Sequence, residues 1–322
     1  MTENVSNLHG RSFEYAITEE LCKLPGATLS LRARGDQERD GAHFRQLSSE
    51  LAEHLKIGAR CVVRNLYRIL PCGVELKDVT IDRLPDTAGM ADQRDVTDIQ
   101  LSFPNYAYPL NLSVKNNHFA LKHQRPSALM QQLGIKKRSQ DDNEYRTGLR
   151  EVYATFNQEA RDFYKQETGE ALSRNTNFRD LTAYDEGFID NHLYNPVCDF
   201  VCQTLQRELA NPVMCQHYFY FLVGNTNFYK LILLNDRVVV EKFNEVPAPA
   251  SCTVQRKSHS YILLFFDNGW QLSLRLHTAS SAIGNTPSLK FDTQLYELED
   301  IGVGFTIPTE NWSLYQTGYR PL

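Results

Sequence analysis

The sequence lacks the features that would identify a membrane protein, a secreted protein or a zinc-ribbon domain. No apolar run reaches the roughly 18 residues of a membrane-spanning helix, and the opening MTENVSNLHG is too polar for a secretory signal. Seven cysteines occur without a Cys-x-x-Cys pair. We therefore expect a cytoplasmic protein with reduced thiols and no membrane partner.

One zinc site is possible even without a Cys-x-x-Cys pair. Cys198 and Cys202 lie one helical turn apart, and Cys215 and His217 follow. Four such ligands could form a structural zinc site, although the spacing is more typical of two cysteines that pack inside a helix.

An excess of positive charge is also missing. The 322-residue chain has a formal net charge of −5, so binding to phosphate would need a local basic surface. Residues 115–138 supply one candidate, because they contain no Asp or Glu but six basic side chains: Lys115, Lys122, Arg125, Lys136, Lys137 and Arg138. The length and the 42% hydrophobic content are enough for a sizeable core in one or two domains.

What the sequence does contain is a pair of alternating segments around a turn. Residues 96–103 alternate apolar and polar side chains, and residues 110–115 do so again after a turn marked by two prolines. We predict two adjacent antiparallel strands. This pairing would bring Asp98 beside Ser113 and Lys115 at one sheet edge.

An acid, a hydroxyl and an ammonium in one place suit phosphodiester cleavage. A carboxylate can hold a divalent cation, which polarises the phosphoryl oxygen and lowers the pKa of an attacking water. A lysine can orient that water or stabilise the developing charge. The pattern resembles the PD-(D/E)xK nucleases, with Asp98 as the first acid and Lys115 as the lysine. Ser113 stands where that family usually has a second acid.

Three separated blocks resemble the HaeIII-type restriction endonucleases. They are GRSFEY at 10–15, SVKNNHFALKHQRP at 113–126, and GWQLSLRLHTASS with PSLKFDTQL between 269 and 295. The resemblance implies an α/β (α+β) nuclease core that cuts double-stranded DNA with Mg²⁺ at a short palindrome, GGCC for the family's namesake. It also implies a cognate DNA methyltransferase as functional partner. Palindromic targets favour a homodimer, with monomers that cut sequentially as the alternative.

The resemblance also implies roles for particular residues. An acid on the first helix of such nucleases often faces the metal, so Glu14 would join Asp98 as a metal ligand. Arg275 and His277 share one face of a predicted strand, and arginine can read guanine in the major groove; a polar sheet face in water is the plainer interpretation. The residues expected to contact DNA are Asn117, His118, Lys122, His123, Arg125, Arg275, His277 and Lys290.

Other chemistries remain open. The run Asn116-Asn117-His118 also suggests an HNH nuclease, in which His118 would activate water and His123 would be the second site residue. The missing second acid leaves room for a sequence-specific DNA-binding protein with weak or lost catalysis. A soluble sugar- or peptide-binding protein would show neither DNA affinity nor clustering of Asp98 with Lys115.

The pattern along the chain predicts three consecutive segments: a nuclease core over 1–150, a helical segment over 151–212 and a β-rich target-recognition region over 213–322. Helices are predicted over 10–24, 44–55, 62–70, 145–166 and 195–209, with polar loops over 28–40 and 167–180. Strands are predicted over 218–222, 228–234, 238–243, 260–266 and 270–276, the last two flanking an Asp-Asn-Gly turn.

Overall fold

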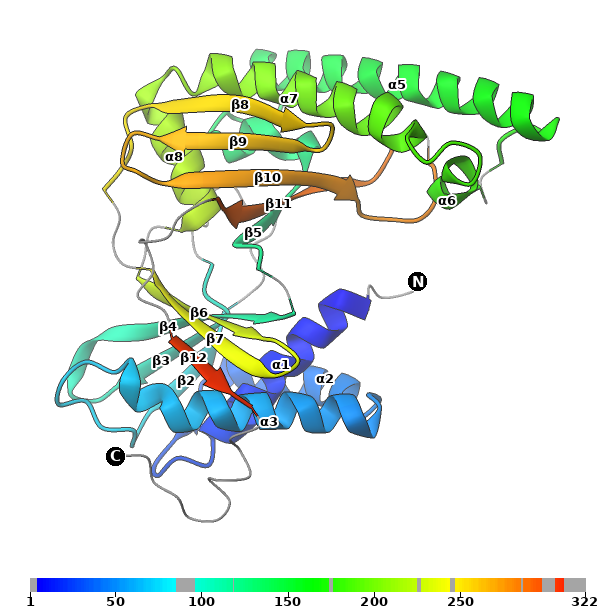
Figure 1. The fold of residues 1–322 in the computed structure, drawn as a ribbon. Helices are drawn as coiled ribbons and strands as arrows, with labels where there is room; N and C mark the ends of the chain where they lie inside the picture. Colours follow the sequence, from blue (N-terminus) through cyan, green and yellow to red (C-terminus); the bar gives the residue numbers. More distant parts are fainter. Residues whose placement is uncertain are drawn as a thin grey trace.

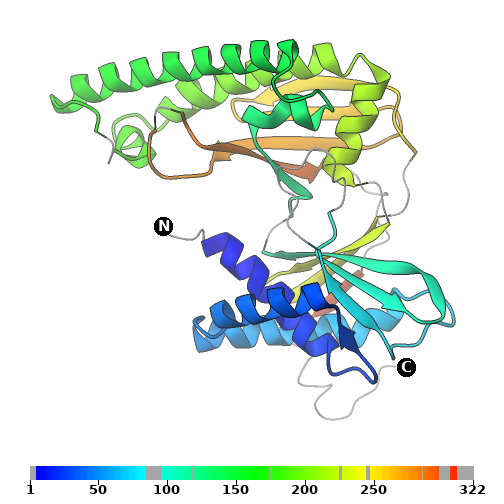
Figure 2. The ribbon, with the colours of Figure 1, turned by 180° about the vertical axis from the view of Figure 1, so that it is seen from behind.

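The chain forms two β-sheets, each packed against its own helices (Figures 1 and 2). The computed structural model describes residues 5–84, 96–117, 119–173, 176–224, 227–243, 247–284, 286–296 and 305–309. This mixed arrangement confirms the predicted fold class. Among the described helices, none is long and apolar enough to cross a membrane.

The first sheet has seven strands in the order β1-β2-β3-β4-β6-β7-β12. Their bounds are β1 Thr28–Leu29, β2 Thr80–Arg83, β3 Ile99–Phe103, β4 Tyr106–Asn116, β6 Phe228–Leu233, β7 Arg237–Phe243 and β12 Phe305–Pro308. Only β1 with β2 and β4 with β6 pair in parallel among these strands. The antiparallel pairing of β3 with β4 confirms the predicted strand pair. The turn is shorter than predicted, because β4 already begins at Tyr106 and contains Pro109 beside a register shift.

Three helices cover one face of the first sheet: α1 Val5–Leu21, α2 Leu31–Phe44 and α3 Ser49–Asn65. The apolar stripe predicted for the first helix is confirmed, since Phe13, Ile17 and Leu21 are fully buried. The short 3₁₀ turn η1 Leu66–Arg68 follows α3.

Two predictions in this region are wrong. The polar stretch 28–40 is mostly helix α2 rather than a loop, because Ser30 caps its start by accepting a hydrogen bond from the Ala33 amide. The side chains that α2 buries recur at helical spacing although two of them are polar: Ala33, Gln37, Asp40, Gly41 and Phe44. The two helices predicted over 44–55 and 62–70 are mainly one, α3, which begins after the cap Ser48.

The second sheet has five strands in the order β5-β11-β10-β9-β8 and is antiparallel throughout its described pairs. The strands are β5 Lys122–Gln124, β8 Cys252–Ser258, β9 Tyr261–Phe266, β10 Gln271–Thr278 and β11 Leu289–Leu295. The helices of this half are η2 Pro126–Ala128, α4 Leu129–Gln132, α5 Gln140–Thr168, α6 Phe178–Thr182, the π-helical turn η3 Asp190–Tyr194, α7 Asn195–Glu208 and α8 Pro212–Val223.

One face of the second sheet packs against these helices in a large apolar core. Leu272, Leu274 and Leu276 of β10 are buried there. Cys198 and Cys202 are buried on α7 in the same core, which confirms that they pack inside a helix. The strand predicted over 218–222 is wrong, because these residues belong to α8. Its start carries signals that outweigh the short apolar run: Asn211 as cap and Pro212 in the first turn.

Each sheet draws strands from both ends of the chain. β6, β7 and β12 complete the first sheet, and β5 forms an edge of the second. The predicted segments 1–150, 151–212 and 213–322 therefore do not coincide with the two sheets, and their status as domains stays a prediction. The connection between β4 and β5 is only residues 117–121, so the strand that carries Lys115 runs almost directly into the second sheet.

Candidate active site

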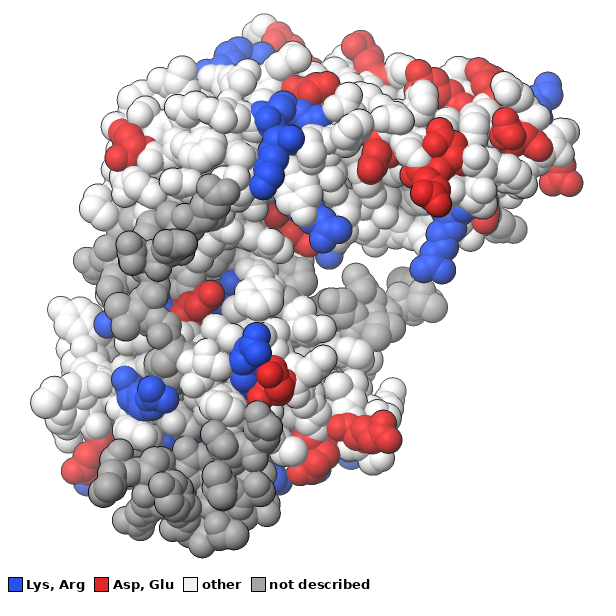
Figure 3. Space-filling model, viewed as in Figure 1, with Lys and Arg blue, Asp and Glu red and all other residues white. Residues whose placement is uncertain are grey.

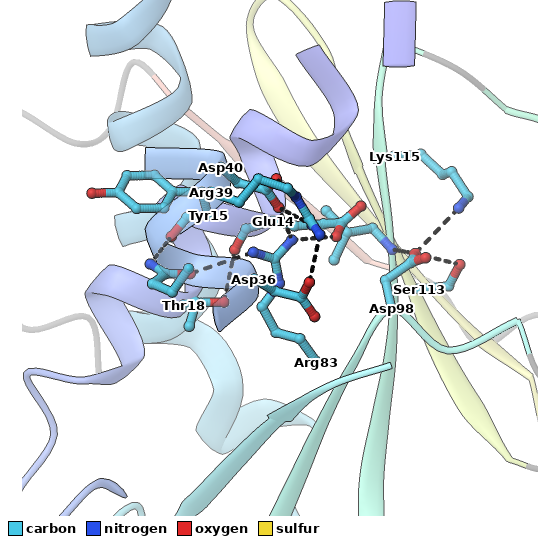
Figure 4. Close-up of polar contacts among 12 residues, drawn as sticks. Glu14, Tyr15, Thr18, Asp36, Arg39, Asp40, Arg83, Asp98, Ser113 and Lys115 are labelled. Atoms are coloured by element: carbon cyan, nitrogen blue, oxygen red, sulfur yellow. Dashed lines mark hydrogen bonds and ion pairs between the residues drawn. The ribbon is translucent and has the colours of Figure 1, made fainter. Parts of the chain in front are cut away.

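The candidate site is built on the carboxylate of Asp98, the residue directly before β3. The Asp98 amide donates to the Leu112 carbonyl at 2.9 Å, which places the residue beside the end of β4. Its Oδ2 accepts hydrogen bonds from the Val114 amide at 2.6 Å, the Lys115 Nζ at 3.2 Å and the Ser113 Oγ at 3.3 Å (Figure 4). The structure thus brings together the three residues that the sequence pattern placed at one sheet edge.

The strand geometry explains this convergence. Ser113 and Lys115 lie two residues apart on β4 and so point to the same side. Asp98 and Lys115 are each about a quarter exposed, so the pair is accessible from solvent while Ser113 is buried. All three hydrogen bonds fall on Oδ2; among the described residues none donates to Oδ1, which leaves that oxygen for another ligand.

Glu14 lies on α1, across from Asp98. Its Oε2 accepts a hydrogen bond from Arg83 Nη2 at 2.7 Å, and the same nitrogen lies 2.9 Å from Oδ2 of Asp40 (Figure 4). Arg83 and Asp40 are both buried, and Arg39 pairs with Asp40 at 2.8 Å. Sequence reasoning missed Arg83 and Asp40, because a single charged residue at an inward strand position gives no recognisable signal before the partner helix is known.

The electrostatics tie Glu14 to Asp98. Burial is the main cause that raises the pKa of Glu14 from its ordinary 4.5 to about 7, and the negative charge of Asp98 raises it further. The Arg83 guanidinium and the more distant Lys115 act in the opposite direction. Two carboxyl groups that repel each other in a partly buried place form a site where a cation would be favourable.

The donor set fits a hard divalent cation with few protein ligands. Magnesium takes oxygen ligands and is usually held by one or two carboxylates, with water and substrate phosphate completing its shell. Glu14 and Asp98 supply two such carboxylates, and Ser113 supplies a hydroxyl. Within the part of the chain that the structure describes, no cluster of three or more His, Cys, Asp or Glu side chains could hold a metal.

A second group of predicted residues gathers on the second sheet. We call the side of that sheet opposite its helices the open face; it carries His123, Arg275, His277, Lys290 and Asp292. Arg275 and His123 are exposed there, whereas Leu274 and Leu276, on either side of Arg275 in β10, point into the core. Figure 3 shows a hollow between the two lobes with Lys and Arg side chains on its upper rim, while acidic side chains gather over the far ends of α5 and α7.

Asp292 is the centre of this group. It lies opposite His123 on β5 and opposite Arg275 on β10 in the strand register. Its Oδ1 is 2.5 Å from His123 Nδ1 and 3.0 Å from His277 Nε2, and the Asp292 side chain is buried. No role for Asp292 was expected from the sequence; the signal for one is its alternation with Lys290 on a polar strand face.

The remaining residues predicted to contact DNA lie in different settings. Lys122 is buried and points inward, with Nζ 4.1 Å from the Phe221 ring centroid. Arg125 donates to Ser288 at 3.3 Å near the open face. Asn117 is exposed and its amide donates to Leu233. His118 falls outside the described residues. The described partner of the HNH alternative, His123, is on β5 with Asp292 and not in the Asp98 cluster.

Comparisons with known proteins agree along almost the whole chain. The model of the HaeIII restriction endonuclease family matches residues 10–248 and 245–299. The type II restriction enzyme HaeIII of Haemophilus aegyptius is 24% identical over 335 aligned positions, which cover 94% of this chain and 96% of that protein. No solved structure matches the chain.

Proposed function

Because the chain belongs to the HaeIII restriction endonuclease family, a family of site-specific deoxyribonucleases, we propose that it hydrolyses double-stranded DNA at a short palindrome. The reaction would take place at the Asp98 cluster with Mg²⁺, and GGCC is the first target sequence to test. The observation that carries the proposal is the convergence of Ser113, the Val114 amide and Lys115 on one carboxylate oxygen of Asp98.

We assign the following roles to the residues of the site. Asp98 and Glu14 would hold the divalent cation, which supplies charge neutralisation of the scissile phosphate and a more acidic water. Three hydrogen bonds keep Asp98 in one orientation, so that little reorganisation is needed when the cation and phosphate bind. Arg83 holds Glu14 toward Asp98 through the 2.7 Å contact. Ser113 supports the Asp98 carboxylate in the position where PD-(D/E)xK nucleases usually have a second acid.

Lys115 has the most direct role in the reaction. Its ammonium lies 3.2 Å from Asp98 Oδ2 and is accessible from solvent. A phosphate bound beside Asp98 would therefore lie next to the positive charge of the Lys115 ammonium. Lys115 would orient the attacking water and stabilise the negative charge that develops on the phosphoryl oxygens.

DNA recognition would take place on the open face of the second sheet. Strands can read base edges in the major groove when they present polar side chains in a regular row. Arg275 and Lys290 offer donors suited to guanine and phosphate, and Asp292 fixes the two histidines. Partners would be double-stranded DNA, a cognate methyltransferase and a second copy of the chain, in the cytoplasm.

The test compares Asp98→Ala with the wild-type protein. We expect DNA binding to persist and Mg²⁺-dependent cleavage to be lost, because the change removes an anionic metal ligand but no phosphate-binding cation. Asp82→Ala on the neighbouring strand is the control, since Asp82 pairs with Arg32 and Ser30 instead. Cleavage by Asp98→Ala at the wild-type rate would remove Asp98 from the site and favour chemistry centred on His118. A wild-type protein that binds its site but never cuts would point to the DNA-binding alternative.

A further inference from the structure

Lys230 of β6 is a buried lysine close to the candidate site. Its side chain is only 2% exposed, although lysine is almost never fully buried unless it is paired. Its Nζ donates to the Phe119 carbonyl and lies 3.5 Å from Glu241 Oε2 on β7. Burial lowers the pKa of Lys230 to about 8; Glu241 opposes this effect and the Lys115 charge adds to it.

The acceptor of this hydrogen bond lies in the segment that joins the two sheets. We call Asn117 and residues 119–121, the described part of that segment, the link. The Asn117 amide donates to Leu233 of the first sheet, and the Leu121 amide donates to Thr293 of the second sheet, each at 2.7 Å. Between these ends, the Phe119 carbonyl is held by Lys230. The link is therefore fastened at both ends and in its middle.

The register places Lys230 where it can act on the site. Lys230 lies opposite Ser113 in the parallel pair β4–β6, so the strand that presents Ser113 and Lys115 is the direct neighbour of Lys230. At the other end, the link runs into β5, which carries His123 on the open face. Eight residues in extended conformation span at most about 28 Å, so Lys115 and His123 are close enough to act on one short stretch of duplex.

We propose that Lys230 is a positioning residue that fixes the path of the link, and thereby the distance between the cleavage residue Lys115 and the open face of the second sheet, to which β5 belongs. This inference rests on the proposed function, which places cleavage on β4 and recognition on the open face. Lys230 touches neither DNA nor metal in this scheme. It sets which phosphate comes to Lys115 once the bases are bound on the second sheet.

The chemistry explains why a lysine is needed there. The long Lys230 side chain reaches from β6 to the Phe119 carbonyl, and Glu241 compensates the buried charge. Replacement by methionine keeps the length and the apolar stem but removes the donor that holds the Phe119 carbonyl, so the link loses the contact that fastens its middle. The link would shift, and a shift of about 1 Å at reacting groups can slow a reaction on the order of 100-fold.

The test measures binding and cleavage separately. Single-turnover cleavage with Mg²⁺ and equilibrium binding with Ca²⁺ would be measured for wild type and Lys230→Met, on the cognate duplex and on a duplex with one changed base pair. We expect Lys230→Met to cleave the cognate duplex at least about tenfold more slowly, with a binding constant within about threefold. Lys242→Met is the matched control, because Lys242 lies on β7 over the Tyr229 ring and away from the link.

Two outcomes would overturn the inference. Lys230→Met could cleave as fast as wild type, or it could lose binding and cleavage in equal proportion with a lowered melting temperature, as a merely structural lysine would. If this variant does not fold, one glycine inserted after Phe119 gives the same test by lengthening the link; undiminished cleavage by that insertion would refute the proposal. Failure of the proposed function itself is distinguishable, because then the wild-type protein would not cut the cognate duplex.

Discussion

The protonation of Glu14 gives a prediction that needs no DNA. In the folded protein the pKa of Glu14 is raised from 4.5 to about 7, chiefly by burial and then by Asp98. One pKa unit corresponds to about 1.4 kcal/mol, so this rise corresponds to about 3 kcal/mol of folding free energy. A raised carboxyl pKa favours the protonated form, so its contribution to stability is present below about pH 4.5 and is lost as the pH rises through about 7.

Glu14→Gln should remove this dependence. Glutamine resembles the protonated acid and can still accept from Arg83, which also keeps its 2.9 Å ion pair with Asp40. In EDTA, the free energy of unfolding of the variant relative to wild type should therefore increase by up to about 3 kcal/mol between about pH 4.5 and pH 8. Chemical denaturation at several pH values measures this difference. Glu20→Gln, on the same helix in an exposed pair with Lys23, is the control.

Divalent cation gives the second half of this experiment. If Glu14 is a metal ligand, Mg²⁺ at about pH 8 should stabilise the wild-type protein, because the cation binds only the folded state, and should stabilise Glu14→Gln much less. Parallel stability curves for wild type and Glu14→Gln across this pH range would refute the electrostatic reasoning. Equal stabilisation of both proteins by Mg²⁺ would refute the role of Glu14 as a ligand.

Three further predictions concern cleavage and recognition. Lys115→Ala should slow single-turnover cleavage on the order of 100-fold, as loss of a preorganised charge does; if a His118→Ala variant is inactive and Lys115→Ala is not, the HNH chemistry replaces this one. Arg275→Ala should cost about 1–3 kcal/mol for the cognate duplex and much less for scrambled DNA if Arg275 reads a guanine, whereas equal weakening on both duplexes, with a smaller salt dependence, would make it a phosphate contact. Asp292→Asn should weaken cognate binding roughly tenfold, because the charge-assisted hydrogen bond between Asp292 and His123 is worth about 1.5 kcal/mol or more; unchanged discrimination between cognate and scrambled DNA would contradict this.

The candidate site was largely predictable because its main elements are local. Asp98, Ser113 and Lys115 lie within two strands joined by a tight turn, so alternation and turn residues alone determine that they meet. Glu14 depended on the resemblance to a family, since nothing in α1 by itself indicates which side chain faces β3. The roles of Arg83 and Lys230 could not be predicted from the sequence, because both are buried and their hydrogen-bond partners lie far away along the chain. Arg83 is 69 residues from Glu14, and Lys230 is 111 residues from Phe119.

The errors in the fold have the same origin. Helix α2 was missed because its buried stripe contains Gln37 and Asp40, which look like loop residues until α1 and Arg83 supply their partners. The run 218–222 was assigned to a strand because a fully buried helix and a buried strand are both continuously apolar over a few residues. The exchange of strands between the two sheets depends on the β4–β6 pairing, a long-range parallel contact that no local pattern encodes.

Cleavage of a fully sequenced plasmid, with the ends mapped, tests the central claim most directly. The wild-type protein with Mg²⁺ should produce discrete fragments whose ends all fall at one short palindrome, GGCC if the target matches that of the namesake. The wild-type protein in EDTA and the Asp98→Ala variant with Mg²⁺ should produce no fragments. Discrete cleavage that persists in Asp98→Ala, or fragments with no common sequence at their ends, would contradict the assignment of a site-specific nuclease that acts through Asp98.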